Sequence, residues 1–108
     1  MNFYVGNSIE QLNVKEINVE LDDEMVEYLY SIKEIIPYAA FFSLDPYSDT
    51  VVEKEDISDI ILMCEYVLKE QVLNDYNESE ELIFAIKELN DLCCKAINQC
   101  EKITVIGD

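Results

Sequence analysis

The predicted fold depends on one stretch of the chain, residues 55–73, which reads EDISDIILMCEYVLKEQVL. Its apolar side chains recur every three or four positions, so a helix would gather them on one face. They are Ile57, Ile60, Ile61, Cys64, Val67, Leu68 and Val72. A helix with one broad apolar face has to pack against another element. We therefore expect a helix from about Glu55 to Leu73 that forms part of a core.

A second helix is expected before this stretch. Met25, Leu29, Ile32 and Ile36 follow the same spacing. Asp22 or Asp23 can accept hydrogen bonds from its first amides, and Pro37 should end it. Residues 38–52, between the two helices, show neither helical nor strand periodicity, and we expect an ordered connection there.

A third helix is expected after Asn77, which can cap it with Glu80 as the capping-box partner. Its apolar stripe consists of Leu82, Ile86, Leu89, Cys93, Ala96 and Cys100.

Short strands are expected at both ends of the chain. Phe3-Tyr4-Val5 precedes Gly6-Asn7, and Ile103-Thr104-Val105-Ile106 precedes Gly107-Asp108; each is a β-prone run that ends in a turn signal. Residues 17–21 alternate apolar and polar, which fits a third strand or an extended lead into the first helix. The predicted fold class is α+β: a single domain, residues 1–108, in which about three amphipathic helices pack on a small sheet formed by short terminal strands.

Charge is the strongest compositional feature of the 108 residues. Twenty-four Asp and Glu side chains oppose seven lysines, for a formal net charge of −17, and the chain has no arginine or histidine. Such a surface repels nucleic-acid phosphates and anionic lipids, so we expect neither direct nucleic-acid binding nor membrane binding. It attracts basic proteins and accelerates their encounter. A basic protein is the expected partner, although acidity can also serve solubility alone.

The N-terminal sequence has neither a basic n-region nor an apolar h-region, so a cytoplasmic location is expected. The four cysteines are then expected to be reduced. Cys64, Cys93 and Cys100 fall on apolar stripes, where a free cysteine packs as a small hydrophobe, and Cys94 is expected to be exposed.

The residues that catalysis commonly uses are scarce. Without histidine the usual general base is missing, without arginine the common phosphate clamp is missing, and two glycines cannot build a phosphate loop. We expect no enzyme activity, no catalytic residues and no cofactor. A calcium-responsive regulator is an alternative, because Asp45 to Asp56 spans twelve positions with acids at the first, fifth, ninth and last. Tyr47 and Thr50 depart from the calcium-loop pattern, and no metal site is expected.

The same segment is predicted to be the partner-binding site. Tyr47 offers an aromatic anchor beside carboxylates that can hold lysines and arginines. The predicted contacts are Asp45, Tyr47, Asp49, Glu53 and Glu55. Turn formation and capping of the following helix would also explain Pro46 and Asp49.

Residues 3–7 (FYVGN), 44–50 (LDPYSDT) and 103–108 (ITVIGD) together resemble small bacterial immunity proteins of contact-dependent inhibition and polymorphic-toxin systems. The resemblance implies a cytoplasmic antidote that binds a cognate toxin domain, commonly a nuclease, and masks its active site. It carries no catalytic residues over to this chain. A nucleic-acid mimic that binds a DNA-binding protein would share the same electrostatics and is a further alternative.

Overall fold

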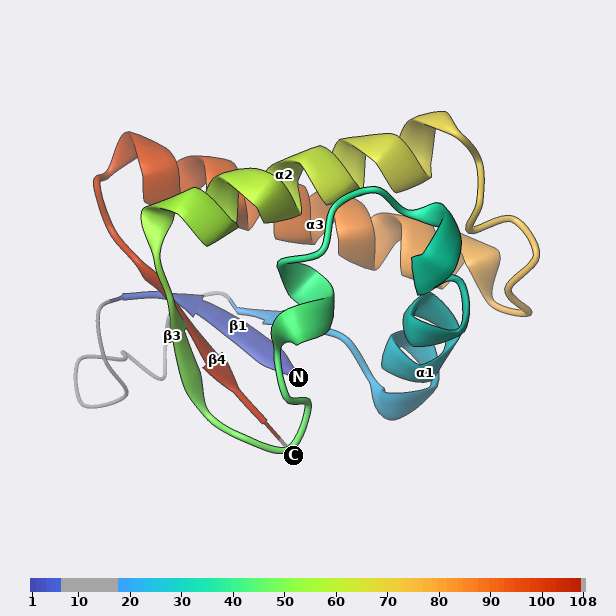
Figure 1. Ribbon diagram of the computed structural model, residues 1–108, viewed down its shortest axis with the longest axis horizontal. Helices are drawn as coiled ribbons and strands as arrows, with labels where there is room; N and C mark the ends of the chain where they lie inside the picture. Colours follow the sequence, from blue (N-terminus) through green and yellow to red (C-terminus); the bar gives the residue numbers. More distant parts are fainter. Residues whose placement is uncertain (7–17, 108) are drawn as a thin grey trace.

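The computed structural model describes residues 1–6 and 18–107, and the described residues form three α-helices packed on a four-stranded antiparallel sheet (Figure 1). The elements in chain order are β1 (Asn2–Val5), β2 (Val19–Glu20), α1 (Asp23–Ser31), the 3-10 helices η2 (Lys33–Ile35) and η3 (Phe41–Ser43), β3 (Thr50–Val52), α2 (Lys54–Lys69), α3 (Ser79–Asn98) and β4 (Ile103–Ile106). The predicted α+β class, with helices on a small sheet, is confirmed.

The terminal strands lie at the centre of the sheet, whose strand order is β2-β1-β4-β3. Phe3 pairs with Val105 on β4 and with Val19 on β2, and all three side chains are buried. Residues directly opposite one another in an antiparallel pair share one face of the sheet. The predicted pairing of the two ends of the chain is therefore confirmed, and it brings apolar residues together on the face that the core covers.

The two outer strands were only partly predicted. Val19–Glu20 within the predicted segment 17–21 forms β2, whereas Ile17 lies outside the described residues. The prediction of an ordered connection over 38–52 did not include a strand, but Thr50–Val52 at its end forms β3. Three residues carry too little periodicity to indicate a strand, and β3 pairs with β4, which lies about fifty positions further along the chain.

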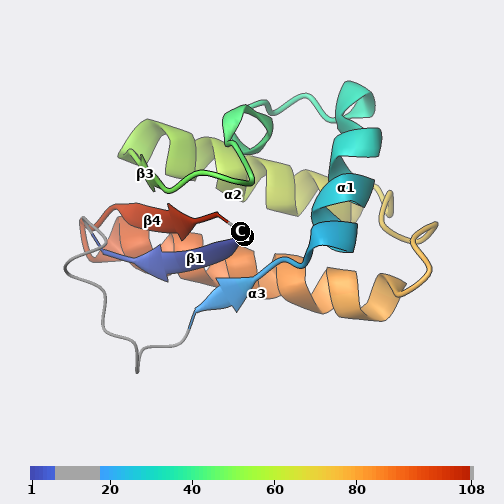
Figure 2. The same ribbon diagram turned by 90° about the horizontal axis from the view of Figure 1, so that it is seen from below.

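Helices α2 and α3 run antiparallel, pack closely on each other and cover one face of the sheet (Figure 2). The predicted apolar stripes supply this contact: Ile57, Ile60, Cys64 and Val67 from α2 and Leu82, Ile86, Leu89, Cys93 and Ala96 from α3 are all buried. Helix α1 lies beside them at one end of the molecule (Figure 1). No helix in residues 1–6 and 18–107 is both long and apolar enough to cross a membrane.

Helix α1 begins as predicted and ends early. The Asp22 carboxylate accepts a hydrogen bond from the amide of Met25 at 2.9 Å, which caps the first turn. The helix then ends at Ser31 instead of Ile36, and the chain continues as η2. Ile36 is extended, with φ −103° and ψ 118°, as expected of a residue before proline.

Helices α2 and α3 end on residues with a left-handed backbone. Gln71 has φ 58° and Cys100 has φ 56°, and the chain has no glycine at either helix end. Beyond α3 the amide of Glu101 donates to the carbonyl of Ala96 at 2.9 Å, and that of Cys100 to Ile97 at 3.1 Å. This is the Schellman arrangement, in which glycine normally occupies the position of Cys100.

The predicted start of α3 is wrong by one residue. Glu78 occupies the cap position, and no side-chain capping bond is present there, so Asn77 and Glu80 do not form a capping box. Acidic residues Glu80 and Glu81 in the first turn still favour the positive end of the helix.

Candidate partner-binding surface

The predicted contact residues begin in a tight turn formed by residues 45–48. The Asp45 carboxylate accepts hydrogen bonds from the amide of Tyr47 at 2.9 Å and from the hydroxyl of Ser48 at 3.0 Å. Asp45 thus holds the turn that presents Tyr47, a common use of aspartate at the first turn position. The Tyr47 side chain is 75% exposed, the most exposed of the large hydrophobic residues described.

Asp49 has a structural task. Its carboxylate accepts a hydrogen bond from the amide of Gly107 at 3.0 Å, which ties the end of β4 to the turn. The two backbones are so close that a Cβ on Gly107 would lie 2.5 Å from the nitrogen of Ser48. The turn and the C-terminal strand therefore position each other.

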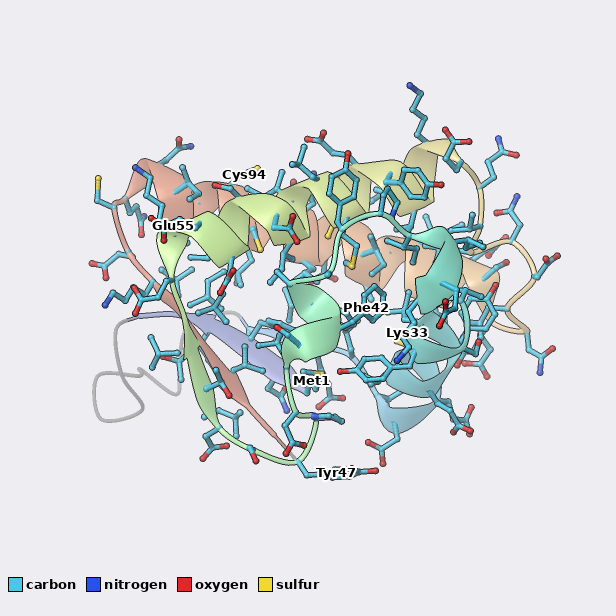
Figure 3. The ribbon with its side chains drawn as sticks, in the orientation of Figure 1. Met1, Lys33, Phe42, Tyr47, Glu55 and Cys94 are labelled. Carbon is cyan, nitrogen blue, oxygen red and sulfur yellow. The ribbon has the colours of Figure 1, made fainter. Side chains whose placement is uncertain are left out.

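Glu53 and Glu55 lie away from Tyr47. Figure 3 shows Tyr47 and Glu55 at opposite ends of the segment that contains β3. Glu53 forms an exposed ion pair with Lys102, at 3.2 Å, and Glu55 lies in the first turn of α2. Of the five predicted contacts, Asp45, Tyr47 and Asp49 lie in or beside the turn, whereas Glu53 and Glu55 lie beyond β3. The binding role of all five stays a prediction.

A groove lies between α1 and this turn, and the sequence reasoning missed it. It has a volume of about 490 Å³, and its lining residues are Asp23, Val26, Glu27, Tyr30, Pro46 and Tyr47. We call it the α1–turn groove. The four α1 residues are spaced i, i+3, i+4 and i+7, which places them on one face of the helix. That spacing was a usable signal in the sequence, but nothing local indicated that the 45–48 turn would pack against this face.

Tyr30 forms a wall of the groove in a fixed position. Its hydroxyl donates to the carbonyl of Leu44 at 2.6 Å, and its ring makes edge contacts with Phe41 and Phe42. Burial and the nearby charge of Asp45 raise the pKa of the Tyr30 hydroxyl, so it remains a neutral donor.

A second group of acids, from the starts of α1 and α3, acts on Tyr76. The rings of Tyr28 and Tyr76 contact each other with centroids 5.0 Å apart, and the Tyr28 hydroxyl donates to the carbonyl of Val72 at 2.7 Å. Burial raises the pKa of Tyr76, and four carboxylates raise it further: Asp22, Glu24, Glu78 and Glu81. We call these four residues the helix-start cluster. They come from two segments some fifty residues apart, so the sequence showed two acidic runs but not that both act on Tyr76.

Within the helix-start cluster, Glu78 and Glu81 interact directly. A hydrogen bond with Glu81, followed by the charge of Glu81, slight desolvation and the charge of Asp22, raises the pKa of Glu78 above its usual range. Carboxylates this close compete to remain ionised. A cation that approached the cluster would relieve this repulsion.

The burial of the cysteines differs from the prediction at one position. Cys64 and Cys93 are buried as expected, burial raises the pKa of Cys93 to about 12, and Cys94 is exposed as expected (Figure 3). Cys100 is also exposed, which corrects the expectation that it is part of the core. The reason is that α3 ends at Asn98, so the helical stripe does not reach Cys100.

The calcium-loop alternative finds no matching geometry. Asp45, Asp49 and Glu53 each have different partners. Asp45 accepts from the Tyr47 amide and the Ser48 hydroxyl, Asp49 accepts from the Gly107 amide, and Glu53 pairs with Lys102. Across residues 1–6 and 18–107, no group of three or more Asp, Glu and Cys side chains is placed so that it could hold a metal ion.

Comparison with protein-family models, with curated proteins and with solved structures finds no match for this chain.

Proposed function

We propose that this protein is an acidic binding protein that neutralises a basic toxin, in the manner of the immunity proteins that its sequence resembles. Binding alone performs this function, so no catalytic group and no cofactor is required. The proposal includes a cytoplasmic location, where an antidote meets a toxin that has entered the cell.

The convergence of acids around α1 is the observation that carries the proposal. Helix α1 has the α1–turn groove, with Asp23 and Glu27, on one side, and it shares the helix-start cluster with α3. Asp23–Ser31 contains no basic residue, and none of the described residues that line the groove is a lysine. Like charges at this density cost folding free energy, and a cationic partner offsets that cost.

A nuclease must display lysines and arginines to hold nucleic-acid phosphates. An acidic surface with exposed aromatic residues can cover such a site, because potentials of opposite sign steer the encounter and aromatic side chains anchor the complex. Association should then be fast and should slow as ionic strength rises.

The test uses the product of the gene directly upstream as the toxin. Co-expression with this protein should restore the growth that the toxin arrests, and the two purified proteins should form a complex whose association rate falls with salt. Absence of both rescue and complex would overturn the proposal. A complex with a host DNA-binding protein in place of the toxin would also overturn it, in favour of nucleic-acid mimicry.

Two matched pairs of substitutions test which acidic residues accelerate association with the partner. Glu78→Gln/Glu81→Gln removes two acids from the helix-start cluster, whereas Glu55→Gln/Asp56→Asn removes two from the first turn of α2, a different helix start. We expect the first pair to slow association by roughly 3- to 10-fold at low salt and the second by less than twofold. Equal effects of the two pairs would show that total charge, and not this surface, governs binding.

A further inference from the structure

The α1–turn groove combines three kinds of surface within about 490 Å³. Val26 and Pro46 are its apolar part, Tyr30 and Tyr47 contribute aromatic rings, and Asp23 and Glu27 contribute carboxylates. The exposed residues among them are the acids and Tyr47, whereas Val26 is buried. The groove is therefore apolar at its base and negatively charged at its rim.

Tyr30 and the backbone of the turn are held in place without a ligand. The Tyr30 hydroxyl donates to the carbonyl of Leu44, Asp45 holds the turn that presents Tyr47, and Asp49 ties this turn to Gly107. These parts of the groove lose little conformational entropy on binding. This rigidity distinguishes the groove from a scatter of acidic side chains on a surface.

The two carboxylates of the groove are on one helix face, four residues apart. Side chains at this spacing are neighbours on the helix surface. A single cation placed beside both carboxylates gains attraction from each.

Among cationic groups, the guanidinium of arginine fits this combination best. Its planar face stacks on aromatic rings, its five N–H donors can reach two carboxylates at once, and its methylene stem packs on apolar surface. The ammonium of lysine is more strongly hydrated and offers no planar face to a tyrosine ring.

We propose that the α1–turn groove binds an arginine side chain of the partner protein, with the stem on Val26 and Pro46, the guanidinium against Tyr47 and its donors directed to Asp23 and Glu27. This inference rests on the proposed function, because it names the group on the basic partner that the acidic surface recognises. It also moves the expected contacts from Asp49, Glu53 and Glu55 to α1.

The test measures binding of short peptides to the groove in the absence of the toxin. The probe is a capped pentapeptide with one arginine between two pairs of glycines, and the matched peptides carry lysine or the uncharged isostere citrulline in its place. In NMR titrations of the full chain, the arginine peptide should shift the amide signals of Val26, Glu27, Tyr30 and Tyr47. It should bind about threefold more tightly than the lysine peptide and at least tenfold more tightly than the citrulline peptide. Equal binding of all three peptides, or shifts centred on Tyr76 and Glu78, would overturn the inference.

Variants of exposed residues sharpen the result. Tyr47→Ala and Glu27→Gln should each weaken the arginine peptide by roughly 3- to 10-fold, Tyr47→Phe should bind as the wild type does, and Glu55→Gln, which removes one charge from α2, should change affinity by less than twofold. Unchanged thermal midpoints would show that the variants fold. If Glu55→Gln weakened binding more than Glu27→Gln, the groove would be the wrong site.

The two proposals fail in different ways. Toxin neutralisation that survives Tyr47→Ala/Glu27→Gln at wild-type affinity would overturn the arginine site and leave the antidote function in place. Arginine-peptide binding in the groove without any toxin complex would overturn the antidote function alone.

Discussion

The α2–α3 pair and the end of the molecule around α1 use their residues differently. Helix α3 buries seven residues and α2 buries five, in a contact that also covers the sheet, whereas α1 buries only Met25, Val26 and Leu29. Around α1 the chain places carboxylates and tyrosines instead, and acids from the starts of α1 and α3 both act on Tyr76. Apolar burial supplies most folding free energy, while exposed aromatic and charged residues supply recognition. Buried apolar residues and exposed carboxylates therefore dominate separate parts of this small domain.

The largest expected effect tests whether burial in the α2–α3 pair supplies most of the folding free energy. Ile86→Ala in α3 removes a fully buried side chain and should lower the free energy of unfolding by about 2–5 kcal/mol, measured by urea denaturation. Phe84→Ala on the same helix, where the side chain is 63% exposed, should change it by less than about 0.5 kcal/mol. Similar losses of unfolding free energy for the two variants would contradict the packing of one face of α3 in the core.

The next largest effect is expected where the end of β4 meets the 45–48 turn. Gly107→Ala would place a Cβ 2.5–2.8 Å from backbone atoms of Tyr47 and Ser48, so the turn has to move. We expect a loss of about 1–3 kcal/mol in urea denaturation together with amide shifts at Tyr47. Ser48→Ala adds no atom to the turn and should cost less than about 1 kcal/mol. A Gly107→Ala variant as stable as the wild type would contradict the close approach.

A smaller effect compares two exposed cysteines. Cys100→Gly should raise the free energy of unfolding by about 0.5–1 kcal/mol, because glycine adopts φ 56° without steric cost. Cys94→Gly, in the interior of α3, should lower it by a similar amount. Changes of the same sign at both positions would contradict the left-handed end of α3.

The smallest effect concerns pH and the helix-start cluster. The raised pKa of Glu78 means that the folded state holds its proton more tightly than the unfolded chain. The stabilisation is therefore fully present below the ordinary carboxyl pKa of about 4.5 and is lost as the pH rises through the higher folded value. Between pH 4 and pH 7, the wild type should lose more stability in urea denaturation than Glu78→Gln does.

Glu81→Gln provides the matching arm of this pH experiment. It removes the partner of the same hydrogen bond, so its stability profile should resemble that of Glu78→Gln. Parallel profiles for the wild type and both variants would contradict the interaction between the two carboxyl groups.

Local pattern alone was enough to predict the α2–α3 pair and the pairing of the terminal strands. The stripes of Ile57 to Val67 and Leu82 to Ala96 have one apolar face each, and that face can be satisfied only by burial. The Asp22 cap was predictable for the same local reason. β3 and the early end of α1 were not predictable in this way. Each depends on contacts or on backbone angles that the few residues concerned do not specify by themselves.

What the sequence determined by itself was the fold class, the excess of negative charge and the exposed aromatic residue in the 45–48 turn. What only the tertiary structure decided was which of these charged side chains lie close together. Asp49 and Glu53 hold Gly107 and Lys102, whereas Asp23 and Glu27 face Tyr47 across the α1–turn groove. The physical reason is that the period of a helix specifies which residues share its face, but the neighbour of that face is set by how distant segments pack into one core.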